Sequence, residues 1–404
     1  MPDLQSIISD PYGALGVRKY INATCHHTRV GGTLMPGEVL DAMRSAAEWH
    51  VDVNELQRAA GRVISQYTHA ESGYIVSGCA AALLVGTAAI LTGTDPVKME
   101  ALPHLAGTGM KDRAVAKRFP RRKAADGREY THYGYPHAVK TAGVEFDEVG
   151  DGGPVTAERL DAALTDRTAL VYWSTDEAPG DLSVEDVVKV AHARGVPVLV
   201  DNSNHLPPKQ HLWRYIEAGT DLVAFSGGKG LQGPQGAGIL AGRSDLIEAV
   251  AMQSNPNHGI GRVCKVSKEE IVGQLAALMW WAEGDDEDRM SEHHRRTERL
   301  LAGLSGLDGA HAERVFPDRA GRPYPNVYLH VSPETGMTAA DVMRDLESGD
   351  PPIATMSHAS DPQVIRLDVR LCSDQEIDII SARVREALVS ASDLELGLPP
   401  TGPR

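Results

Sequence analysis

The chain has 404 residues, enough for one large domain and a smaller one, and its 42% hydrophobic and 24% charged residues are an ordinary globular composition. The formal net charge is −15, with 40 Lys and Arg against 55 Asp and Glu. Because nucleic-acid binders usually present a basic face, this acidic balance argues against a nucleic-acid partner.

The cysteines and the apolar runs indicate the compartment. The four cysteines form no CxxC pair and no zinc-like spacing, so we expect reduced thiols, no metal and a cytoplasmic location. The N-terminus lacks the basic and apolar regions of a secretion signal. The longest apolar run, residues 79–91, is too short to cross a bilayer, so we expect no membrane partner.

The predicted elements begin with an arm and helices over residues 1–70. Apolar residues recur at helical spacing in 38–49 and 54–67. A short buried strand at 74–76 is then followed by an alanine-rich helix that runs to Leu91.

Strands and helices alternate through the middle of the chain. We expect strands at 144–149, 169–173, 197–200, 222–225 and 238–240, and helices at 157–164, 184–194, 212–218 and 268–283. Short apolar strands between helices predict an α/β domain, residues 71–283, with a mostly parallel sheet covered on both faces.

The last part, residues 284–404, reads as a small α+β domain. Its half-exposed strands are expected at 328–331 and 364–369, with helices at 339–346 and 374–391. A charged stretch at 284–295 contains His293 and His294, which we interpret as solvated.

One lysine stands alone in the glycine-rich segment Ser226-Gly227-Gly228-Lys229-Gly230, directly after an apolar strand. Glycines let the backbone turn tightly and leave the ammonium group uncrowded. Lys229 therefore suits a Schiff base with an aldehyde cofactor such as pyridoxal 5'-phosphate. The alternative is a turn that carries a solvated lysine.

An anion site is predicted where the strand at 74–76 ends. Ser77, Gly78 and Cys79 lie between that strand and a helix, where free N–H groups and the helix dipole favour a phosphate. The hydroxyl of Ser226 is a further phosphate candidate. The plain alternative is an ordinary strand-to-helix turn.

Asp201 ends an apolar strand, where open α/β sheets place functional side chains. Its carboxylate would keep the cofactor's ring nitrogen protonated, although a helix-capping role is the alternative. Asn204 is a candidate for the phenolic oxygen of the cofactor. The residue that stacks on the ring is expected between 130 and 137, with His132 favoured over Tyr133, Tyr135 and His137.

These segments resemble a known family. The pieces are Ile21–Thr24, Thr28–Gly32, Val53–Gln57, Val76–Ala81, His137–Lys140, Asp201, FSGGKGLQGPQ and Lys265–Gly273, and they cover most of residues 20–275. The chain resembles the selenocysteine synthase and D-glucosaminate-6-phosphate ammonia-lyase group of fold-type I pyridoxal phosphate enzymes, which are aspartate aminotransferase-like.

The resemblance implies roles for residues and for a partner. It implies that Lys229 is the Schiff-base lysine and Asp201 the ring partner, with Ser77, Gly78, Cys79 and Ser226 around the phosphate. Members form homodimers or rings of dimers, in which Arg262 would reach a neighbour's cofactor. The chain departs from the family at Cys25-His26-His27 and at an extension over 118–130, and it shows no N-terminal tRNA-holding domain.

The expected reaction begins with removal of the Cα proton of a small amino-acid substrate by Lys229. We expect β-elimination with release of ammonia, with His26 and His27 as general acids for the leaving group. Racemisation, transamination and a binding protein that kept the fold are the alternatives.

Arginines are the candidates for the substrate's carboxylate, because a guanidinium fork matches it. Arg370 is the first candidate and Arg366 its competitor, and Arg29 in the resembling N-terminal segment is a further substrate-binding candidate. The basic cluster at 117–123 is interpreted as a solvated loop, with a phosphorylated substrate as the alternative.

Overall fold

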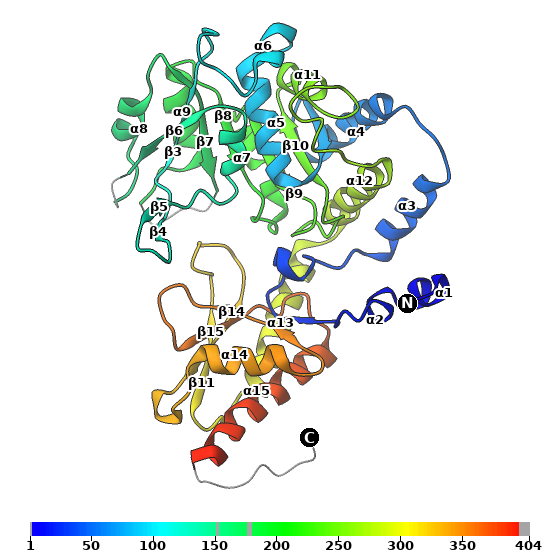
Figure 1. Ribbon diagram of the computed structural model, residues 1–404, viewed down its shortest axis with the longest axis vertical. Helices are drawn as coiled ribbons and strands as arrows, with labels where there is room; N and C mark the ends of the chain where they lie inside the picture. The colour runs from blue at the N-terminus through cyan, green and yellow to red at the C-terminus, as the bar shows by residue number, and fades with distance from the viewer. Residues whose placement is uncertain (1, 151–152, 176–179, 396–404) are drawn as a thin grey trace. The chain divides into compact units, whose positions relative to one another are not determined.

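The computed structural model describes residues 2–150, 153–175 and 180–395 (Figure 1). The chain forms two compact units: Thr33–Gly284, here the large unit, and Met1–Gly32 with Asp285–Arg404, here the small unit. Residues 33–70, expected from the sequence to belong with the N-terminal arm, thus lie in the large unit. Among the described residues, no helix has the length and apolar character to cross a membrane.

A seven-stranded sheet organises the large unit, in the order β2-β10-β9-β8-β7-β3-β6. Only β10 runs against its neighbours, so the sheet is mostly parallel, as the sequence predicted. The strands are β2 (Ser72–Val76), β3 (Arg113–Lys117), β6 (Glu145–Val149), β7 (Thr168–Ser174), β8 (Val198–Asp201), β9 (Leu222–Ser226) and β10 (Gly238–Gly242).

Helices cover both faces of this sheet. Among the helices, α4, α8, α9, α10 and α12 contribute to one apolar cluster, and α5, α7 and α11 contribute to the other. The helices of the unit are α3 (Gly37–Ala47), α4 (Val53–Thr68), α5 (Gly78–Thr92), α6 (Pro96–Ala101), α7 (His137–Thr141), α8 (Ala157–Ala163), α9 (Val184–Ala193), α10 (Arg214–Glu217), α11 (Ser244–Gln253) and α12 (Lys268–Glu283).

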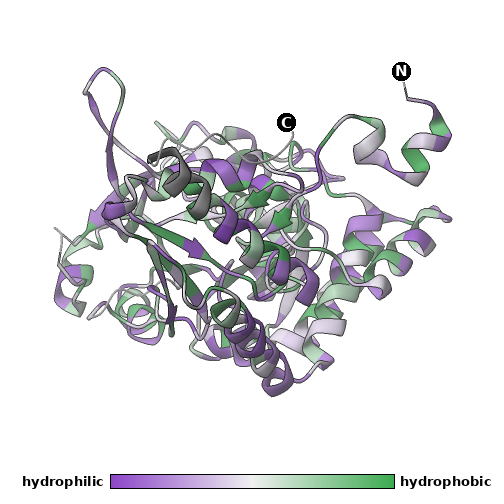
Figure 2. Ribbon diagram, turned by 90° about the horizontal axis from the view of Figure 1, so that it is seen from below, coloured by the Kyte–Doolittle hydropathy of each residue, from purple (hydrophilic) through white to green (hydrophobic). Residues whose placement is uncertain are grey.

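Successive side chains of each strand point to opposite faces of the sheet and therefore belong to different apolar clusters. Val198 and Val200 of β8 belong to the cluster under α9 and α12, whereas Leu199 belongs to the cluster under α5. Because both of their faces are buried, the central strands β7, β8, β9 and β10 are almost continuously apolar, whereas the edge strand β6 carries three acidic residues. Many helices carry hydrophobic and hydrophilic residues together in Figure 2, as helices with one buried face should.

Outside these layers, the extension expected at 118–130 forms a hairpin. Its strands are β4 (Arg121–Lys123), which is exposed, and β5 (Glu129–Thr131). Arg121 is paired with Glu148 at 3.1 Å.

The small unit contains a four-stranded sheet, in the order β11-β12-β15-β14, and a short parallel pair of β1 and β13. Its strands are β1 (Ile21–Asn22), β11 (Ala310–Val315), β12 (Asn326–Val331), β13 (Ile353–Ala354), β14 (Met356–Ser357) and β15 (Val364–Leu367). Its helices are α1 (Leu4–Ser9), α2 (Pro11–Ala14), α13 (Asp286–Gly303), α14 (Ala339–Ser348) and α15 (Asp374–Glu395).

The charged stretch that opens the small unit is helical, and the prediction that His293 is solvated is wrong. α13 turns His293, Thr297 and Leu300 inward at helical spacing, and His293 is only 5% exposed. Burial, reinforced by the charge of Arg370, lowers the pKa of His293 to about 3. The next residue, His294, is half-exposed beside Arg314.

Candidate active site

Lys229 lies in the turn that connects β9 to β10. Backbone hydrogen bonds from Gly227 to Ala237 and from Gly233 to Gly227 close this turn. Gly230 packs so tightly that a Cβ there would lie 2.5 Å from the carbonyl oxygen of Leu206. The small residues thus hold the turn against its surroundings, while Lys229 itself is half-exposed.

The amine of Lys229 points to the carboxyl end of β8. Its Nζ donates to Oγ of Ser203 at 3.4 Å, and the backbone N–H of Ser203 donates to Oδ1 of Asp201 at 3.0 Å. No sequence pattern singles out Ser203, although it links the two residues on which the cofactor prediction depends.

Asp201 is the last residue of β8 and is 7% exposed. It lies two residues beyond Leu199 and therefore faces the same side of the sheet, the side that α5 covers. The hydroxyl of Tyr172 donates to its Oδ2 at 3.1 Å, and the thiol of Cys79 donates to its Oδ1 at 3.7 Å. Removal from water, and then the Asp201 carboxylate, hold the pKa of the Cys79 thiol well above its usual value.

The predicted anion site adjoins this carboxylate. Ser77 is the N-cap residue of α5, and its side chain makes no capping hydrogen bond. Strand pairing sets Val76, Gly238 and Ser226 side by side on three adjacent strands. A Cβ at Gly238 would lie 2.9 Å from the carbonyl carbon of Gly78, so only glycine allows α5 to start this close to the sheet.

Tyr135 stands out among the four residues considered for stacking. Its ring centroid lies 5.3 Å from Nζ of Lys229, and the side chain is 61% exposed. Tyr133 packs instead against Phe119 and Phe146. His132 is half-buried and its role stays a prediction.

Two further candidates are half-buried in loops of the large unit. Asn204 lies three residues beyond Asp201, and Arg262 lies between α11 and α12. Their roles toward a cofactor stay predictions.

These residues fit pyridoxal phosphate by the chemistry of their donors. A lysine amine, a buried carboxylate and a helix N-terminus stand at the carboxyl ends of β9, β8 and β2, the edge where open α/β sheets bind ligands. Lys229 would hold the aldehyde, Asp201 the ring nitrogen, and Ser77 with Gly78 the phosphate.

In the small unit, the segment Cys25-His26-His27 forms a strained turn. Cys25 is buried and has a φ of 61°, a backbone conformation that residues other than glycine rarely adopt. The side-chain amide of Asn22 donates to the carbonyl of Cys25 at 2.9 Å and so fixes the turn. Strain held in this way is frequent at functional sites.

His27 and Arg29 line a pocket of about 390 Å³ in the same unit. Glu347 pairs with Arg29 at 2.8 Å, and Thr355, Ser357 and Arg366 add polar groups to the lining. The structure thus brings His27, a predicted general acid, and Arg29, a predicted substrate-binding residue, together with the competitor Arg366.

Arg370 is engaged elsewhere. Its Nε and Nη2 both donate to the carboxylate of Asp368 at 2.8 Å, and its guanidinium lies 3.8 Å from the ring centroid of Tyr324. By contrast, Nε of Arg366 is buried and has no hydrogen-bond partner, and Nη2 contacts only the sulfur of Met356 among the interactions of the described residues. Arg366 therefore has donors left for an anion.

Comparisons with known proteins identify the family of this chain. Residues 137–319 match the family Aminotransferase class-V. The chain is 29% identical over 388 residues to D-glucosaminate-6-phosphate ammonia lyase of Salmonella typhimurium, covering 95% of this chain and 99% of the relative. It is 30% identical over 398 residues to 5'-C-glycyluridine monooxygenase-decarboxylase of a Streptomyces species, covering 97% and 94%. The chain belongs to the fold-type I pyridoxal phosphate enzymes.

Solved structures show the same fold. A structure of D-glucosaminate-6-phosphate ammonia-lyase superimposes with a TM-score of 0.78 at 28% identity, covering 95% of this chain and 99% of that one. A NifS-like protein, with a TM-score of 0.59 and 16% identity, shares the fold. L-seryl-tRNA(Sec) selenium transferase of Rhizobium meliloti is 27% identical over 337 residues, covering 76% of this chain and 64% of the relative.

Proposed function

We propose that this protein is a pyridoxal phosphate-dependent lyase that eliminates a β-substituent from a hydroxylated or otherwise β-substituted amino acid and releases ammonia. The observation that carries the proposal is the contact from Lys229 through Ser203 to the buried Asp201. The 29% identity to an ammonia lyase along nearly the whole chain supports the elimination chemistry.

Each residue of the site has a task in this proposal. Pyridoxal phosphate, when bound, withdraws electrons from the Cα of an attached amino acid and acidifies its proton. Lys229 accepts that proton, and Ser203 orients the amine before it does so. Asp201 would offer its negative charge to the ring nitrogen of the bound cofactor, and the hydroxyl of Tyr172 holds that carboxylate in place. His26 and His27 remain the proposed acids for the leaving group.

The deciding experiment is a substrate screen of the cofactor-loaded protein that records ammonia, keto acid, oxygen uptake and carbon dioxide together. Elimination predicts ammonia and a keto acid in equal amounts without oxygen uptake. The proposal fails if no β-substituted amino acid yields ammonia or keto acid. A protein that takes up no pyridoxal phosphate would be a binding protein that kept the fold.

A second candidate is oxygen-dependent decarboxylation. The 30% identity to the Streptomyces monooxygenase-decarboxylase over 97% of the chain favours it. Carbon dioxide release coupled to oxygen uptake in the same screen would select this reaction. Exchange of the Cα proton for deuterium without loss of any group would instead indicate a racemase or an aminotransferase.

Removing the charge of Asp201 tests the cofactor assignment. We expect Asp201→Asn to weaken pyridoxal phosphate binding or lower kcat by about 10²–10⁴-fold, since breaking a buried ion pair costs about 3–5 kcal/mol. Titration of the apoprotein, followed by the visible absorbance of the cofactor, measures the affinity. Asp186→Asn, an exposed N-terminal residue of α9, is the matched control and should bind normally.

The pocket of the small unit is proposed to hold the substrate's carboxylate through Arg366. Arg366→Gln should raise KM by about 10–100-fold with a smaller effect on kcat, because a charged hydrogen bond contributes about 1.5–3 kcal/mol. Arg344→Gln, at an exposed arginine of α14, is the control. An unchanged KM in Arg366→Gln would return the assignment to Arg370 or Arg29.

We infer that the protein forms a homodimer or a ring of dimers, acts in the cytoplasm and meets neither membrane nor nucleic acid. The four cysteines are all free, as a reducing compartment favours. Light scattering on the purified protein measures the assembly. A monomer that retains full activity would contradict the role of Arg262 at a neighbour's cofactor.

A further inference from the structure

Three metal-ligating side chains gather on the small unit's sheet, outside the residues assigned above. β11 is the edge strand and pairs antiparallel with β12, which places His311 directly opposite His330. Glu313 lies two residues beyond His311 and therefore on the same face. The opposite face carries Ala312 and Leu329, which pack into the core of the unit.

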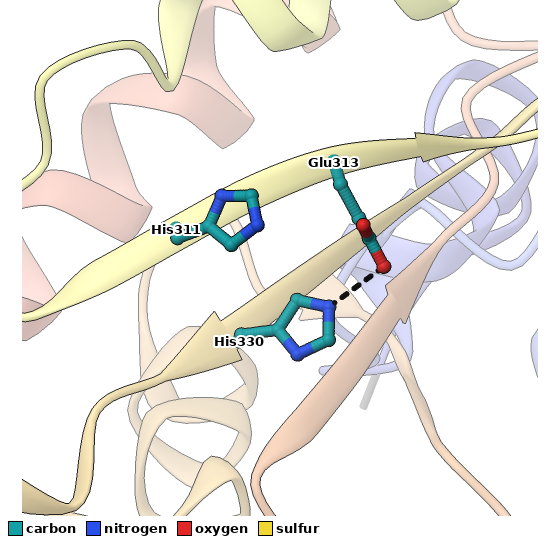
Figure 3. A group of neighbouring side chains, drawn as sticks. All are labelled: His311, Glu313 and His330. Carbon is teal, nitrogen blue, oxygen red and sulfur yellow. Dashed lines mark hydrogen bonds and ion pairs between the residues drawn. The ribbon is translucent and has the colours of Figure 1, made fainter.

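The geometry of the three side chains suits a single ion (Figure 3). Nε2 of His330 lies 3.0 Å from Oε1 of Glu313, and the rings of His311 and His330 stack at 14° with centroids 5.3 Å apart. One ligand atom from each residue lies within 4.8 Å of the others. Ligands about 2.1 Å from a tetrahedral ion are about 3.4 Å apart, so small side-chain rotations would close the site.

We propose that His311, Glu313 and His330 bind a divalent transition-metal ion of the zinc class. Two imidazoles and one carboxylate suit Zn²⁺, Co²⁺, Ni²⁺ and Cu²⁺, whereas Mg²⁺ and Ca²⁺ prefer oxygen ligands alone. Three protein ligands leave a coordination position open for water or another ligand.

The backbone prepares this site before any ion binds. Six residues of β11 pair with six of β12, from Ala310↔Val331 to Val315↔Asn326, so the separation of the three Cβ atoms is fixed. Only side-chain rotations must be restricted on binding, which lowers the entropic cost. The ion would replace the Glu313–His330 hydrogen bond and cross-link the edge strand to its neighbour.

Two arginines lie near the three side chains, but neither is a metal ligand. Arg366 lies on the same face, one strand further, opposite Tyr328. The neighbouring Arg314 points to the other face, where it pairs with Glu298 and His294. Glu313 therefore supplies the negative charge of the proposed site, and Arg314 does not neutralise it because Arg314 lies on the other face of the sheet.

The test uses the full chain, cofactor-loaded and without an affinity tag, after dialysis against a chelator. We expect one equivalent of Co²⁺ per chain, seen by its visible absorption and displaced by Zn²⁺, and a higher melting temperature with Zn²⁺. Mg²⁺ should have no effect. His330→Ala and Glu313→Gln should each weaken binding by about tenfold or more.

Controls separate this site from metal uptake elsewhere. His50→Ala, at an exposed histidine of the large unit, should bind Co²⁺ like the unaltered protein. Circular dichroism and bound cofactor should be unchanged in all variants, because Glu313 and His50 are exposed and His330 is only half-buried. Absence of uptake at stoichiometric Co²⁺, or uptake that both His330→Ala and Glu313→Gln retain, would overturn the proposal.

Discussion

Lys229→Ala is expected to lose turnover by about 10³-fold or more, because the substitution removes both the proposed covalent anchor and the proposed base for the Cα proton. Reduction of the unaltered protein with borohydride should fix the cofactor covalently on the peptide that contains Lys229. Mass spectrometry of the digested protein should find no such adduct in the variant, and this readout does not depend on knowing the substrate.

Lys265→Ala is the matched control, because Lys265 is an exposed lysine of the same unit. It should retain both the adduct at Lys229 and full turnover. A Lys229→Ala protein that keeps turnover within tenfold of the unaltered protein would refute the assignment of the base. An adduct on a different lysine would refute the assignment of the anchor.

Arg370→Met should destabilise the small unit by about 3–5 kcal/mol, because it leaves the carboxylate of Asp368 buried without its partner. Asp368 and Arg370 are 4% and 3% exposed, and no water replaces the lost hydrogen bonds cheaply. Unfolding in urea measures the difference. The double variant with Asp368→Asn should recover part of the loss, since neither residue then carries an unpaired charge.

An exposed pair gives the comparison for this prediction. Arg299 and Asp378 are 40% and 59% exposed, so Arg299→Met should cost no more than about 1 kcal/mol. If Arg299→Met and Arg370→Met lowered the free energy of unfolding equally, the burial of the Asp368–Arg370 pair would not explain the cost of breaking it.

The Asp368–Arg370 pair also makes the free energy of unfolding depend on pH in acid. Burial alone would raise the pKa of Asp368, but the charge and hydrogen bonds of Arg370 outweigh it and lower the pKa from 3.8 to about 2. The ionised carboxylate of Asp368 therefore contributes about 2 kcal/mol to the free energy of unfolding. This contribution is complete above about pH 4 and is lost as the pH falls toward 2. Unfolding curves between pH 2 and 5 should be less pH-dependent in Asp368→Asn.

Much of the large unit could be predicted from sequence because its signals are local. Apolar runs of strand length between helical patterns indicated β7, β8 and β9 within one or two residues of their bounds. β3, Arg113–Lys117, was missed because its two ends are basic and mask a three-residue apolar centre. β11 was missed because it is an edge strand whose alternate residues are polar and exposed.

Residues of the candidate site could be predicted only where the neighbouring sequence is itself distinctive. Lys229 and Asp201 stand out in the sequence, whereas Tyr172 and Ser203 reach Asp201 only through strand pairing and a turn. The choice of Arg370 over Arg366 could not be tested from sequence, because it depends on Asp368 two residues away holding the guanidinium. His293 was misread because a charged run can still turn one face inward.

The contact between Gly238 and the start of α5 has a consequence for engineering this protein. Gly238 follows the turn that carries Lys229 and contacts the backbone at Gly78, where α5 begins. A side chain introduced at position 238 would therefore disturb the proposed lysine anchor and the proposed phosphate site together. Libraries aimed at new substrates should therefore leave residues 226–238 intact. The exposed β4 strand and the lining of the small unit's pocket offer positions that can vary without dismantling the cofactor's binding elements.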